Sequence, residues 1–495
     1  MRSRGLSKSR VMAGVQCQKR LYLEINHPDL AEVSRSTQMR FDQGKRLGEV
    51  ARRLYGNGVL IGHDDNLEQA AAESKALLDT SPADAFFEAT FSHGGVLVRA
   101  DVLQRGKQGL RLVEVKSSTK VKPQHLQDCA IQSWVIEGAG YPLNRIELAH
   151  VDTSFVYPGA GNYTGILRHN DLTGEVRPLM KAVPDWVDQC QQTLAGALPN
   201  IAVGEHCRFP HNCPFIGHCS PPQPEYPITM LHHGGKIVQE LIAEGINDVR
   251  AVPEGRLRKQ VHRRIRRVTL SGRYELDDLA GEMLSRLPYP RYYLDFETVQ
   301  FVVPEWAGTR PYNQLPFQWS CHVEEEDGNL RHVDFLDTSG EPPMRRFAVS
   351  LVDALGDGGP ILVYNMSFEK GRVHELAGTF PDLAKRLHAI AGRMVDLLPI
   401  AQEHYYHPAM KGSWSIKAVL PTIAPELNYQ GLAEVQDGTM AQSAYLEALL
   451  NTETGRRDKL TQALREYCKL DTLAMVKIAH FFEEQKWDRA RMALT

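Results

Sequence analysis

The sequence lacks the features that define several large classes of protein. No stretch reaches the roughly 20 apolar residues of a membrane-spanning helix, and the basic N-terminus contains no sustained apolar run typical of a secretory signal. Neither sign of charge dominates, because 57 Lys and Arg face 60 Asp and Glu, giving a net charge of −3. This balance excludes a uniformly basic nucleic-acid coat but not a local basic patch. We expect a cytoplasmic protein with no membrane partner.

Cysteine is also scarce, at 8 of 495 residues, which is too few for a disulfide-stapled scaffold. In a reducing compartment, clustered cysteines are instead typical of metal ligands. The rest of the composition, 42% hydrophobic and 24% charged, is that of an ordinary globular protein. A chain of this length exceeds one hydrophobic core, so two or three domains are expected.

The first 222 residues show mixed α/β patterning. In chain order, the patterns are a helix around residues 41–56, strands at 85–104 and 109–118, and a helix at 125–140. A Pro-rich stretch then introduces residues 223–287, which we predict to be a basic linker resembling a helical hairpin. The first zone is therefore expected to be a sheet flanked by helices.

Residues 288–495 form the last zone and are also predicted to be α/β. Strand-like runs lie at residues 291–299, 317–325 and 360–366, and most of the remainder is helical in pattern. The predicted architecture is thus α/β throughout, with two sheet-containing domains, 1–222 and 288–495, on either side of the linker.

Two carboxylates and a lysine form the first candidate site. Asp101 lies in one predicted strand, and the next strand carries Glu114 and Lys116, which share a face because they are two residues apart. If the strands pair as a hairpin, Asp101 approaches Glu114. Mg²⁺ or Mn²⁺ would remove the repulsion between the carboxylates, and the lysine would orient a water or stabilise charge on a phosphate. In isolation, the pattern is also typical of an amphipathic surface hairpin.

The order of these elements resembles the PD-(D/E)XK nucleases of the RecB-like group. The resemblance implies a restriction-endonuclease-like domain in which Asp101 and Glu114 hold the metal, Lys116 is catalytic and Gln132 on the following helix helps to place the substrate. The tyrosine usual four residues after the glutamine is replaced by Ile136. The histidine ligand often found on the early helix is absent too, and Glu49 is its candidate substitute.

Four cysteines form a candidate cofactor site. Cys207, Cys213 and Cys219 have five residues between neighbours, and Cys17 lies far upstream. Thiolates bind iron–sulfur clusters or zinc. The alternative ligands for zinc are His206, His211 and His218. Unliganded buried cysteines are the third interpretation.

This layout resembles that of iron–sulfur RecB-like nucleases, which have one cysteine before the nuclease core and three after it. The resemblance implies a 4Fe–4S cluster that ties the two ends of the domain together. The other cysteines lie singly and are predicted to be core residues: Cys129, Cys190, Cys321 and Cys468.

A second acidic constellation lies in the last zone. Asp295 and Glu297 project from one face of a predicted strand. Glu369 begins a helix, and Tyr467 and Asp471 are neighbours on a later helix because they are four residues apart. Four such acidic groups are able to hold two divalent cations about 4 Å apart, which activate water and stabilise the leaving oxygen. Tyr467 would orient the attacking water.

This order resembles the DnaQ-like 3′–5′ exonucleases of the RNase H fold, in the branch whose last motif is tyrosine, three residues, aspartate. The blocks also resemble those of proofreading domains of family-B DNA polymerases. Glu369 stands where aspartate is usual, so the metal geometry must differ. Asp396 is a further acidic candidate, or simply a charge at a helix N-terminus.

Taken together, most of the chain resembles a bacterial family of unknown function that fuses an iron–sulfur RecB-like domain to a DnaQ-like domain. Seven of the twelve residues between the two zones at 256–267 are basic, and we interpret them as a surface that tracks phosphates or, alternatively, as a solvated helix face. These are Arg256, Arg258, Lys259, Arg263, Arg264, Arg266 and Arg267.

The sequence thus predicts a dual metal-dependent nuclease. DNA is the expected substrate, in single strands or at ends, in repair or in defence against foreign DNA. A 3′–5′ exoribonuclease and a nucleic-acid-binding module with an inactive centre are the alternatives. Protein partners are not predicted.

Overall fold

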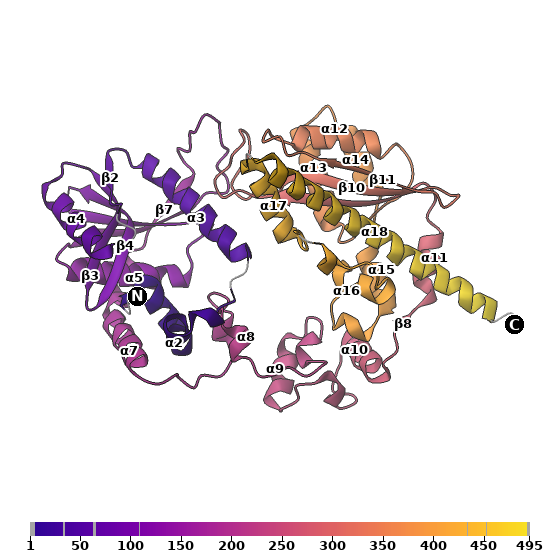
Figure 1. The fold of residues 1–495 in the computed structure, drawn as a ribbon, viewed down its shortest axis with the longest axis horizontal. Helices are drawn as coiled ribbons and strands as arrows, with labels where there is room; N and C mark the ends of the chain where they lie inside the picture. The colour runs from indigo at the N-terminus through magenta and orange to yellow at the C-terminus, as the bar shows by residue number, and fades with distance from the viewer. Residues whose placement is uncertain are drawn as a thin grey trace. The chain divides into compact units, whose positions relative to one another are not determined.

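The computed structural model describes residues 5–32, 35–62, 66–107, 109–432, 434–451 and 453–492 (Figure 1). The fold is mixed α/β, as the sequence predicts. The chain divides into two compact units: unit 1 is Met1–Pro221 with Phe301–Asn313, and unit 2 is Pro222–Gln300 with Gln314–Thr495. Among the described residues, no helix is long and apolar enough to cross a membrane.

Unit 1 is built on a sheet with the strand order β2-β3-β4-β5-β6-β7, to which β1 adds by pairing with β4. β3, β4 and β5 form an antiparallel meander, and β6 runs parallel to β5. The strands are β1 (Leu6–Ser7), β2 (Gly58–Leu60), β3 (Ala85–His93), β4 (Val96–Gly106), β5 (Gly109–Lys116), β6 (Leu143–Val151) and β7 (Leu167–Asp171).

Helices complete unit 1 and match the helical patterns of the sequence. α5 is buried almost all round because it crosses between β5 and β6 and packs in the main core of the unit. The helices are α1 (Lys8–Gln16), α2 (Gln18–Asn26), α3 (Arg35–Leu54), α4 (Leu67–Thr80), α5 (Pro123–Gly138), α6 (Thr173–Leu179), α7 (Val183–Ala195) and α8 (Ile216–Cys219), with 3-10 turns η1 (Pro28–Leu30), η2 (Met180–Ala182) and η3 (Glu205–Cys207).

Unit 2 contains a sheet in the order β11-β10-β9-β12-β13. Its first half is antiparallel and its second half is parallel. Every residue of β10 is buried, as expected for a strand covered on both faces. The strands are β8 (Glu275–Leu276), β9 (Arg291–Val299), β10 (Leu315–Glu324), β11 (Leu330–Leu336), β12 (Ile361–Val363), β13 (Met394–Asp396) and β14 (Tyr405–Tyr406), of which β8 and β14 form a separate pair.

Helices of unit 2 cover this sheet, and the long helix α18 lies along it (Figure 1). The helices are α9 (Gly235–Ala243), α10 (Gln260–Ser271), α11 (Asp278–Ser285), α12 (Met344–Ala354), α13 (Ser367–Thr379), α14 (Ala384–Gly392), α15 (Leu397–His404), α16 (Ile416–Ile423), α17 (Gly438–Leu450) and α18 (Thr454–Met492), with 3-10 turns η4 (Ile228–Met230), η5 (Val249–Ala251), η6 (Pro408–Met410) and η7 (Tyr429–Gly431).

The structure divides the chain into two units rather than the three predicted zones, and the difference lies in residues 223–287. These residues are helical, as expected, but they belong to unit 2 rather than standing apart as a linker. The reason is a shared core: Leu241 and Ile265 are fully buried in the same apolar cluster as Tyr293 of β9 and Tyr405 of β14. Apolar burial, which the basic residues of this segment mask in the sequence, decides the unit boundary.

Residues 301–313, between β9 and β10, belong to unit 1. Val302 and Val303 are buried there with Leu47 and Val50 of α3. The backbone of Tyr157 exchanges hydrogen bonds with this segment, donating to Thr309 O at 2.9 Å and accepting from Gly308 N at 2.8 Å. Unit 1 is therefore completed by a segment that enters from the middle of unit 2's sequence.

Truncating Val302 and Val303 to Ala should weaken unit 1 locally. Deleting buried methyl groups leaves a cavity and costs about 1–3 kcal/mol for the pair. Hydrogen exchange of the full chain should become faster in α3 and remain unchanged in β11. Val349→Ala on α12, where the side chain is 39% exposed, is the control. Unchanged exchange in α3 would contradict this account of the segment.

Candidate metal centres

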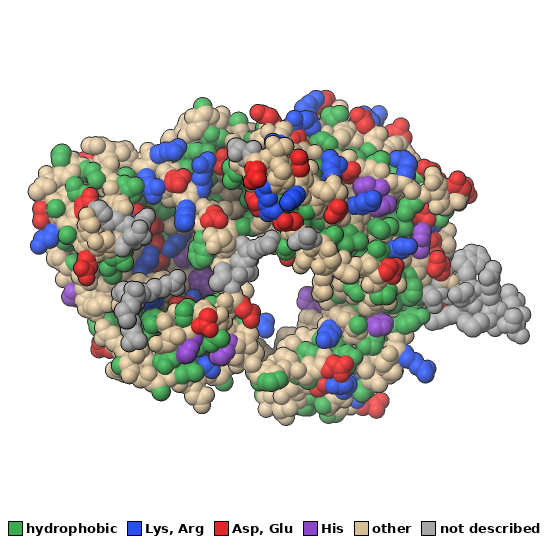
Figure 2. Space-filling model, viewed as in Figure 1, with side chains coloured by type: hydrophobic (Ala, Val, Ile, Leu, Met, Phe, Trp, Pro, Cys, Tyr) green, Lys and Arg blue, Asp and Glu red, His purple; other side chains and the backbone are tan. Residues whose placement is uncertain are grey.

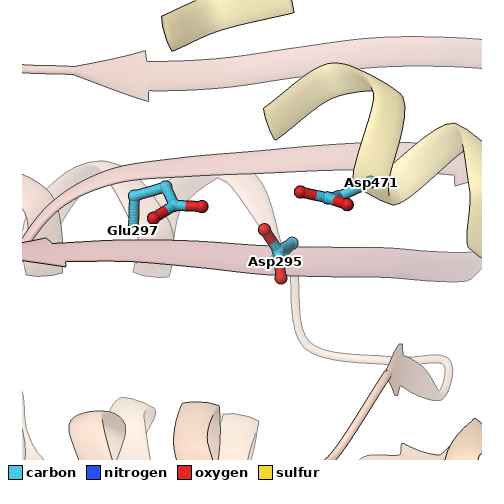
Figure 3. A group of neighbouring side chains, drawn as sticks. All are labelled: Asp295, Glu297 and Asp471. Atoms are coloured by element: carbon cyan, nitrogen blue, oxygen red, sulfur yellow. The ribbon is translucent and has the colours of Figure 1, made fainter. Parts of the chain in front are cut away.

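Three carboxylates of unit 2 converge as the sequence predicts. Asp295 and Glu297 project from one face of β9, and Asp471 reaches them from α18 (Figure 3). One oxygen of each lies within 4.8 Å of the others. Glu297 is 9% and Asp471 6% exposed, so the group is largely removed from water. We call these residues, with Glu369 and Tyr467, the unit 2 centre.

Hydrogen bonds to β10 fix the rotation of α18 that presents Asp471. Gln318 Nε2 donates to Leu464 O at 2.8 Å. Thr472, next to Asp471, places its hydroxyl 2.8 Å from His322 Nδ1 and 3.0 Å from Ser320 Oγ. These buried polar contacts leave α18 one rotational setting, in which Asp471 faces β9.

Burial perturbs all the carboxyls of the unit 2 centre. Burial and mutual repulsion raise the pKa of Asp295 and of Glu297 well above their ordinary values, and Asp471 contributes to both shifts. Burial raises the pKa of Asp471 to about 6, although a hydrogen bond from Tyr429 and the charge of Lys417 oppose the shift. Excess negative charge of this kind is the electrostatic signature of a cation site.

Glu369 lies at the edge of this group rather than in it. It is 2% exposed on α13, and burial raises its pKa to about 8. Its charge acts on Asp295, but it is not among the three carboxylates that lie within 4.8 Å of one another. Glu369 Oε2 is buried without a hydrogen-bond partner, so its lone pairs are unused.

Asp396 acts as a charge at a helix N-terminus, the simpler of its two interpretations. Its carboxylate accepts hydrogen bonds from Leu398 N at 3.0 Å, as the N-cap of α15, and from Asn365 N and Met366 N, each at 2.9 Å. Three backbone donors occupy the side chain, which therefore braces the start of α13 near Glu369 rather than offering free oxygens.

Two further residues, which the sequence analysis missed, hold the tyrosine and the last aspartate. Lys417 Nζ donates to Tyr467 OH at 3.0 Å and lies 4.8 Å from the centre of the Tyr467 ring. Tyr429 OH donates to Asp471 Oδ1 at 2.5 Å. Burial and the nearby Asp471 raise the pKa of Tyr467, so its hydroxyl keeps its proton. No local pattern singles out Lys417 or Tyr429, because packing alone brings them here.

Cys468 is buried, as predicted for a core residue, but it also touches the centre. Its thiol donates to Asp295 Oδ2 at 3.5 Å. Burial and the charge of Asp295 raise its pKa well above the ordinary value, so the thiol stays protonated. The carboxylate set of the unit 2 centre fits a hard divalent cation such as Mg²⁺ or Mn²⁺, which prefers oxygen ligands.

The first predicted site also assembles, in unit 1. β4 and β5 pair antiparallel with Val102 opposite Val113, which places Asp101 beside Glu114. Asp101 Oδ2 accepts a hydrogen bond from Val115 N at 2.8 Å. Burial and the charge of Glu114 raise the pKa of Asp101 to about 7. The predicted hairpin is therefore confirmed, with the two carboxylates close enough to repel.

α5 and α1 supply the partners of this pair. Gln132 Nε2 donates to Glu114 Oε2 at 2.6 Å and to Asp128 Oδ1 at 2.8 Å. Lys116 Nζ donates to Glu114 Oε1 at 2.6 Å and to Asp128 Oδ2 at 2.7 Å. Lys8, from α1, lies 2.8 Å from Glu114 Oε1 and 3.1 Å from Asp128 Oδ1. We call these residues, with Asp101, the unit 1 centre.

Asp128 and Lys8 were missed in the sequence. Asp128 was detectable, because it lies four residues before Gln132 and hence on the same face of α5. Lys8 carries no such signal. Glu49 is exposed on α3 and is not among the groups that shift the pKa of Asp101, so the structure does not place it in the centre.

The four predicted ligand cysteines are free thiols in one region of unit 1. Cys207, Cys213 and Cys219 share an apolar cluster with Phe215. Cys17 lies between α1 and α2, and burial, with the charges of Cys207 and Cys17, raises the pKa of Cys213. Gln16 ties α1 to the loop by donating to His206 O at 2.6 Å and to His211 O at 2.7 Å. The two ends of unit 1 therefore meet at the cysteines.

Among the described residues, no three of these thiols and histidines bring their ligand atoms within 4.8 Å of one another. His206 Nε2 lies 3.5 Å from Cys207 Sγ.

Most of the basic residues at 256–267 form ion pairs or hydrogen bonds within unit 2. Arg256 pairs with Glu244 at 2.6 Å, Arg267 pairs with Glu275 at 2.6 Å, and Arg266 Nε donates to Val252 O at 2.6 Å. Arg264 donates to Gln402 O at 3.0 Å. Arg258, Lys259 and Arg263 are exposed, but Lys259 Nζ donates to His233 O at 3.0 Å and Arg263 donates to Arg258 O at 2.9 Å. On the face drawn in Figure 2, basic and acidic side chains are interspersed. These contacts favour the interpretation of the basic run as a solvated helix face over that of a surface that tracks phosphates.

Metal-free protein should lose stability as the pH rises from about 5 to about 8. Asp471 and Glu369 keep their protons to a higher pH in the folded chain (pKa about 6 and about 8) than in the unfolded chain. The unfolded state thus binds fewer protons in this window, and the free energy of unfolding falls. The melting temperature of unit 2 in a chelator should drop by roughly 5–10 °C, and Mg²⁺ should restore it at pH 8.

Asp471→Asn should flatten this dependence, whereas Asp353→Asn, at an exposed acid of the same unit, should not. A melting temperature of the chelated protein that rises with pH would contradict the assignment.

Comparisons with known proteins cover only part of the chain. Residues 292–415 match the protein-family profile described as a domain of unknown function, DUF2779. This range includes Asp295, Glu297 and Glu369 but ends before Tyr467 and Asp471.

Three curated proteins of Ureaplasma and Mycoplasma are similar to the chain. An uncharacterized protein, UU173, of Ureaplasma parvum serovar 3 is 24% identical over 227 residues, which are 41% of this chain. The uncharacterized protein MG366 homolog of Mycoplasma pneumoniae is 30% identical over 221 residues, and the uncharacterized protein MG366 of Mycoplasma genitalium is 26% identical over 220 residues, each 40% of this chain. The chain matches a third (33%) of the length of each relative.

Proposed function

We propose that the protein is a metal-dependent nuclease with two centres, one in each unit. The observation that carries the proposal is the convergence of Asp295, Glu297 and Asp471 within 4.8 Å, beside a tyrosine four residues from the last aspartate. Buried carboxylates with raised pKa values are costly, and their retention in one place is typical of a functional site. The unpartnered oxygen of Glu369 offers a fourth ligand.

The sheets support the two family resemblances. Unit 2 has acidic residues on the central strand of a sheet that is antiparallel on one side and parallel on the other, which agrees with a DnaQ-like domain of the RNase H fold. Unit 1 has an antiparallel meander followed by a helix and a parallel strand, with the Asp101, Glu114 and Lys116 motif on the meander. This agrees with a PD-(D/E)XK domain.

In the unit 2 centre, Asp295, Glu297 and Asp471, with Glu369, would hold the divalent cations. Such cations activate water and stabilise the leaving oxygen of a phosphodiester. Tyr467 keeps its proton and is held by Lys417, so its hydroxyl has a fixed direction in which to orient a water. Tyr429 holds Asp471 in one rotamer by donating to Oδ1.

In the unit 1 centre, Asp101 and Glu114 are the metal ligands and Lys116 is the group that stabilises charge on the phosphate. Gln132 donates to both Glu114 and Asp128, which makes it a positioning residue for the carboxylates. We further propose that the four cysteines bind a 4Fe–4S cluster. The proposal is supported by the apolar cluster that Cys207, Cys213 and Cys219 share and by Cys17, which is close enough to Cys213 to help raise its pKa.

The proposed substrate is DNA, with hydrolysis from a 3′ end at the unit 2 centre. Removing one centre should leave the other active. Asp295→Ala should abolish release of mononucleotides from a labelled 3′ end, whereas Asp101→Ala or Lys116→Ala should remove only the second cleavage activity. The measurement is digestion of single- and double-stranded DNA and RNA, labelled at either end, with Mg²⁺ and with Mn²⁺.

Graded variants separate the unit 2 residues in the same assay. Asp471→Ala should be nearly inactive, because it removes a metal ligand. Tyr467→Phe should be milder, with a fall in the cleavage rate of at most roughly 10²–10⁴-fold, because it removes one orienting contact. Asp353→Asn is the matched control. Preference for RNA would favour the exoribonuclease alternative, and binding without any cleavage would favour the binding module. Digestion from the 5′ end would contradict the proposal.

The cysteine assignment predicts a brown protein when purified without oxygen, with broad absorbance near roughly 400 nm. Cys213→Ser should bleach it and destabilise unit 1, because the two ends of that unit meet at the cysteines. Cys190→Ser, at a buried cysteine of α7, should leave the colour unchanged. A colourless protein with one equivalent of zinc would overturn the cluster assignment.

A further inference from the structure

The unit 1 centre contains a second lysine, Lys8, that the catalytic motif does not account for. Its ammonium lies 2.8 Å from Glu114 Oε1, the same oxygen that Lys116 contacts at 2.6 Å. It also lies 3.1 Å from Asp128 Oδ1. The side chain of Lys8 is 22% exposed, and that of Glu114 is 1% exposed. Two ammonium groups thus converge on one buried carboxylate.

Buried neighbours on both sides hold Lys8 in place. Leu6 is 5% exposed and pairs with Val96 as part of β1, and Val11 is fully buried one turn into α1. Ser7, the N-cap of α1, accepts a hydrogen bond from Arg10 N at 3.4 Å. Lys8 is therefore anchored by strand pairing and by the core of unit 1, and it is a fixed part of the centre.

The formal charges of the two centres differ, because the unit 1 centre has one lysine more and one carboxylate fewer than the unit 2 centre. In the unit 1 centre, Asp101, Glu114 and Asp128 face Lys8 and Lys116, which leaves one negative charge. The nearby His125 is neutral at pH 7, because burial and Lys116 lower its pKa to about 4.

In the unit 2 centre, four carboxylates face one ammonium, Lys417, which leaves three negative charges. One divalent cation brings the first centre to +1, and two bring the second to the same value. A positive centre is what a phosphodiester anion requires.

Gln132 provides a second indication that the unit 1 centre binds a ligand. This side chain is fully buried, and both carboxylate contacts of its Nε2 fix the amide orientation. Its Oε1 is left buried without a hydrogen-bond partner among the described residues. An unpartnered buried acceptor beside the acidic pair points to a bound cation or its water.

We propose that Lys8 is the fixed second cation of the unit 1 centre and takes the place of a second divalent ion. The inference rests on the proposed function, because it assumes that this centre binds metal and cleaves phosphodiesters. Lys8 neutralises Glu114 and Asp128 and leaves Asp101 and Glu114 to bind one cation. The unit 1 centre is then a one-cation site and the unit 2 centre a two-cation site.

The test counts Mn²⁺ in the full chain carrying Asp295→Asn and Asp471→Asn, which disable the unit 2 centre. Free Mn²⁺ is measured by its electron paramagnetic resonance signal, and cleavage of labelled DNA is followed in parallel. With Lys8 present, one equivalent should bind. Lys8→Met should tighten Mn²⁺ binding by roughly tenfold or more, or admit a second equivalent, because it removes a positive charge a few ångströms away.

Cleavage by Lys8→Met should fall by roughly 10²-fold, because the group that holds Glu114 and Asp128 is lost. Lys8→Arg, which keeps the charge, should bind one equivalent with the original affinity. Asp128→Asn should weaken Mn²⁺ binding. Lys19→Met, at a lysine of α2 outside the centre, is the matched control. A folding defect is not able to mimic the Lys8→Met result, since misfolding weakens binding and does not tighten it.

Unchanged or weaker Mn²⁺ binding in Lys8→Met would overturn the inference while leaving the proposed function intact, provided that the chain with Lys8 still binds Mn²⁺ and cleaves. Two equivalents bound in the presence of Lys8 would overturn it as well. If the chain with Lys8 binds no Mn²⁺ and cuts no nucleic acid, the proposed function of unit 1 fails, and the inference fails with it.

Discussion

The repulsion between buried carboxylates is the constraint on which both units depend. Asp295, Glu297 and Asp471 share a site from which water is largely excluded, and Asp101 and Glu114 share another. Such groups do not stay together by mutual attraction, so the scaffold must hold them. It does so with rigid elements: neighbouring positions of one strand, a paired strand, or a long helix whose rotation is set by hydrogen bonds to β10. The cost of assembling the charges is met by the packing of the sheets.

The two units balance that repulsion in different ways. Unit 1 brings in two lysines, so its carboxylates are largely neutralised by the protein itself. Unit 2 has only Lys417 among its described residues near the carboxylates, and burial raises the pKa of all four of its carboxyls. In unit 1 the raised pKa of Asp101, about 7, is the corresponding effect, beside two built-in ammonium groups.

Regular periodicities made most of the two centres predictable. Asp295 with Glu297, and Glu114 with Lys116, follow the two-residue repeat of a strand, and Tyr467 with Asp471 follows the four-residue repeat of a helix. The strands that carry them were predicted for the same reason. Lys8, Lys417 and Tyr429 were not, because they reach the centres only through tertiary packing, across 106, 50 and 42 residues respectively from Glu114, Tyr467 and Asp471.

The unit boundary was missed for a related physical reason. Residues 223–287 follow a Pro-rich stretch and contain a basic run, and they were predicted to be a helical linker. Apolar residues of these helices instead join the core around Tyr293 and Tyr405. The opposite happens after β9, where the short segment with Val302 and Val303 leaves unit 2 and completes the core of unit 1. Charge is counted easily along a sequence, whereas burial depends on which side of an element faces a partner.

This interleaving has a consequence for how the centres are built. β9 carries two of the three converging carboxylates of unit 2, and the chain that follows it enters unit 1, where Tyr312 OH donates to Ser117 O, next to Lys116. The residues that end one acidic strand are thus joined, within a short stretch of covalent chain, to the residue that follows the lysine of the other centre. A substitution that disturbs the segment 301–313 acts on the packing of unit 1 through Val302 and Val303.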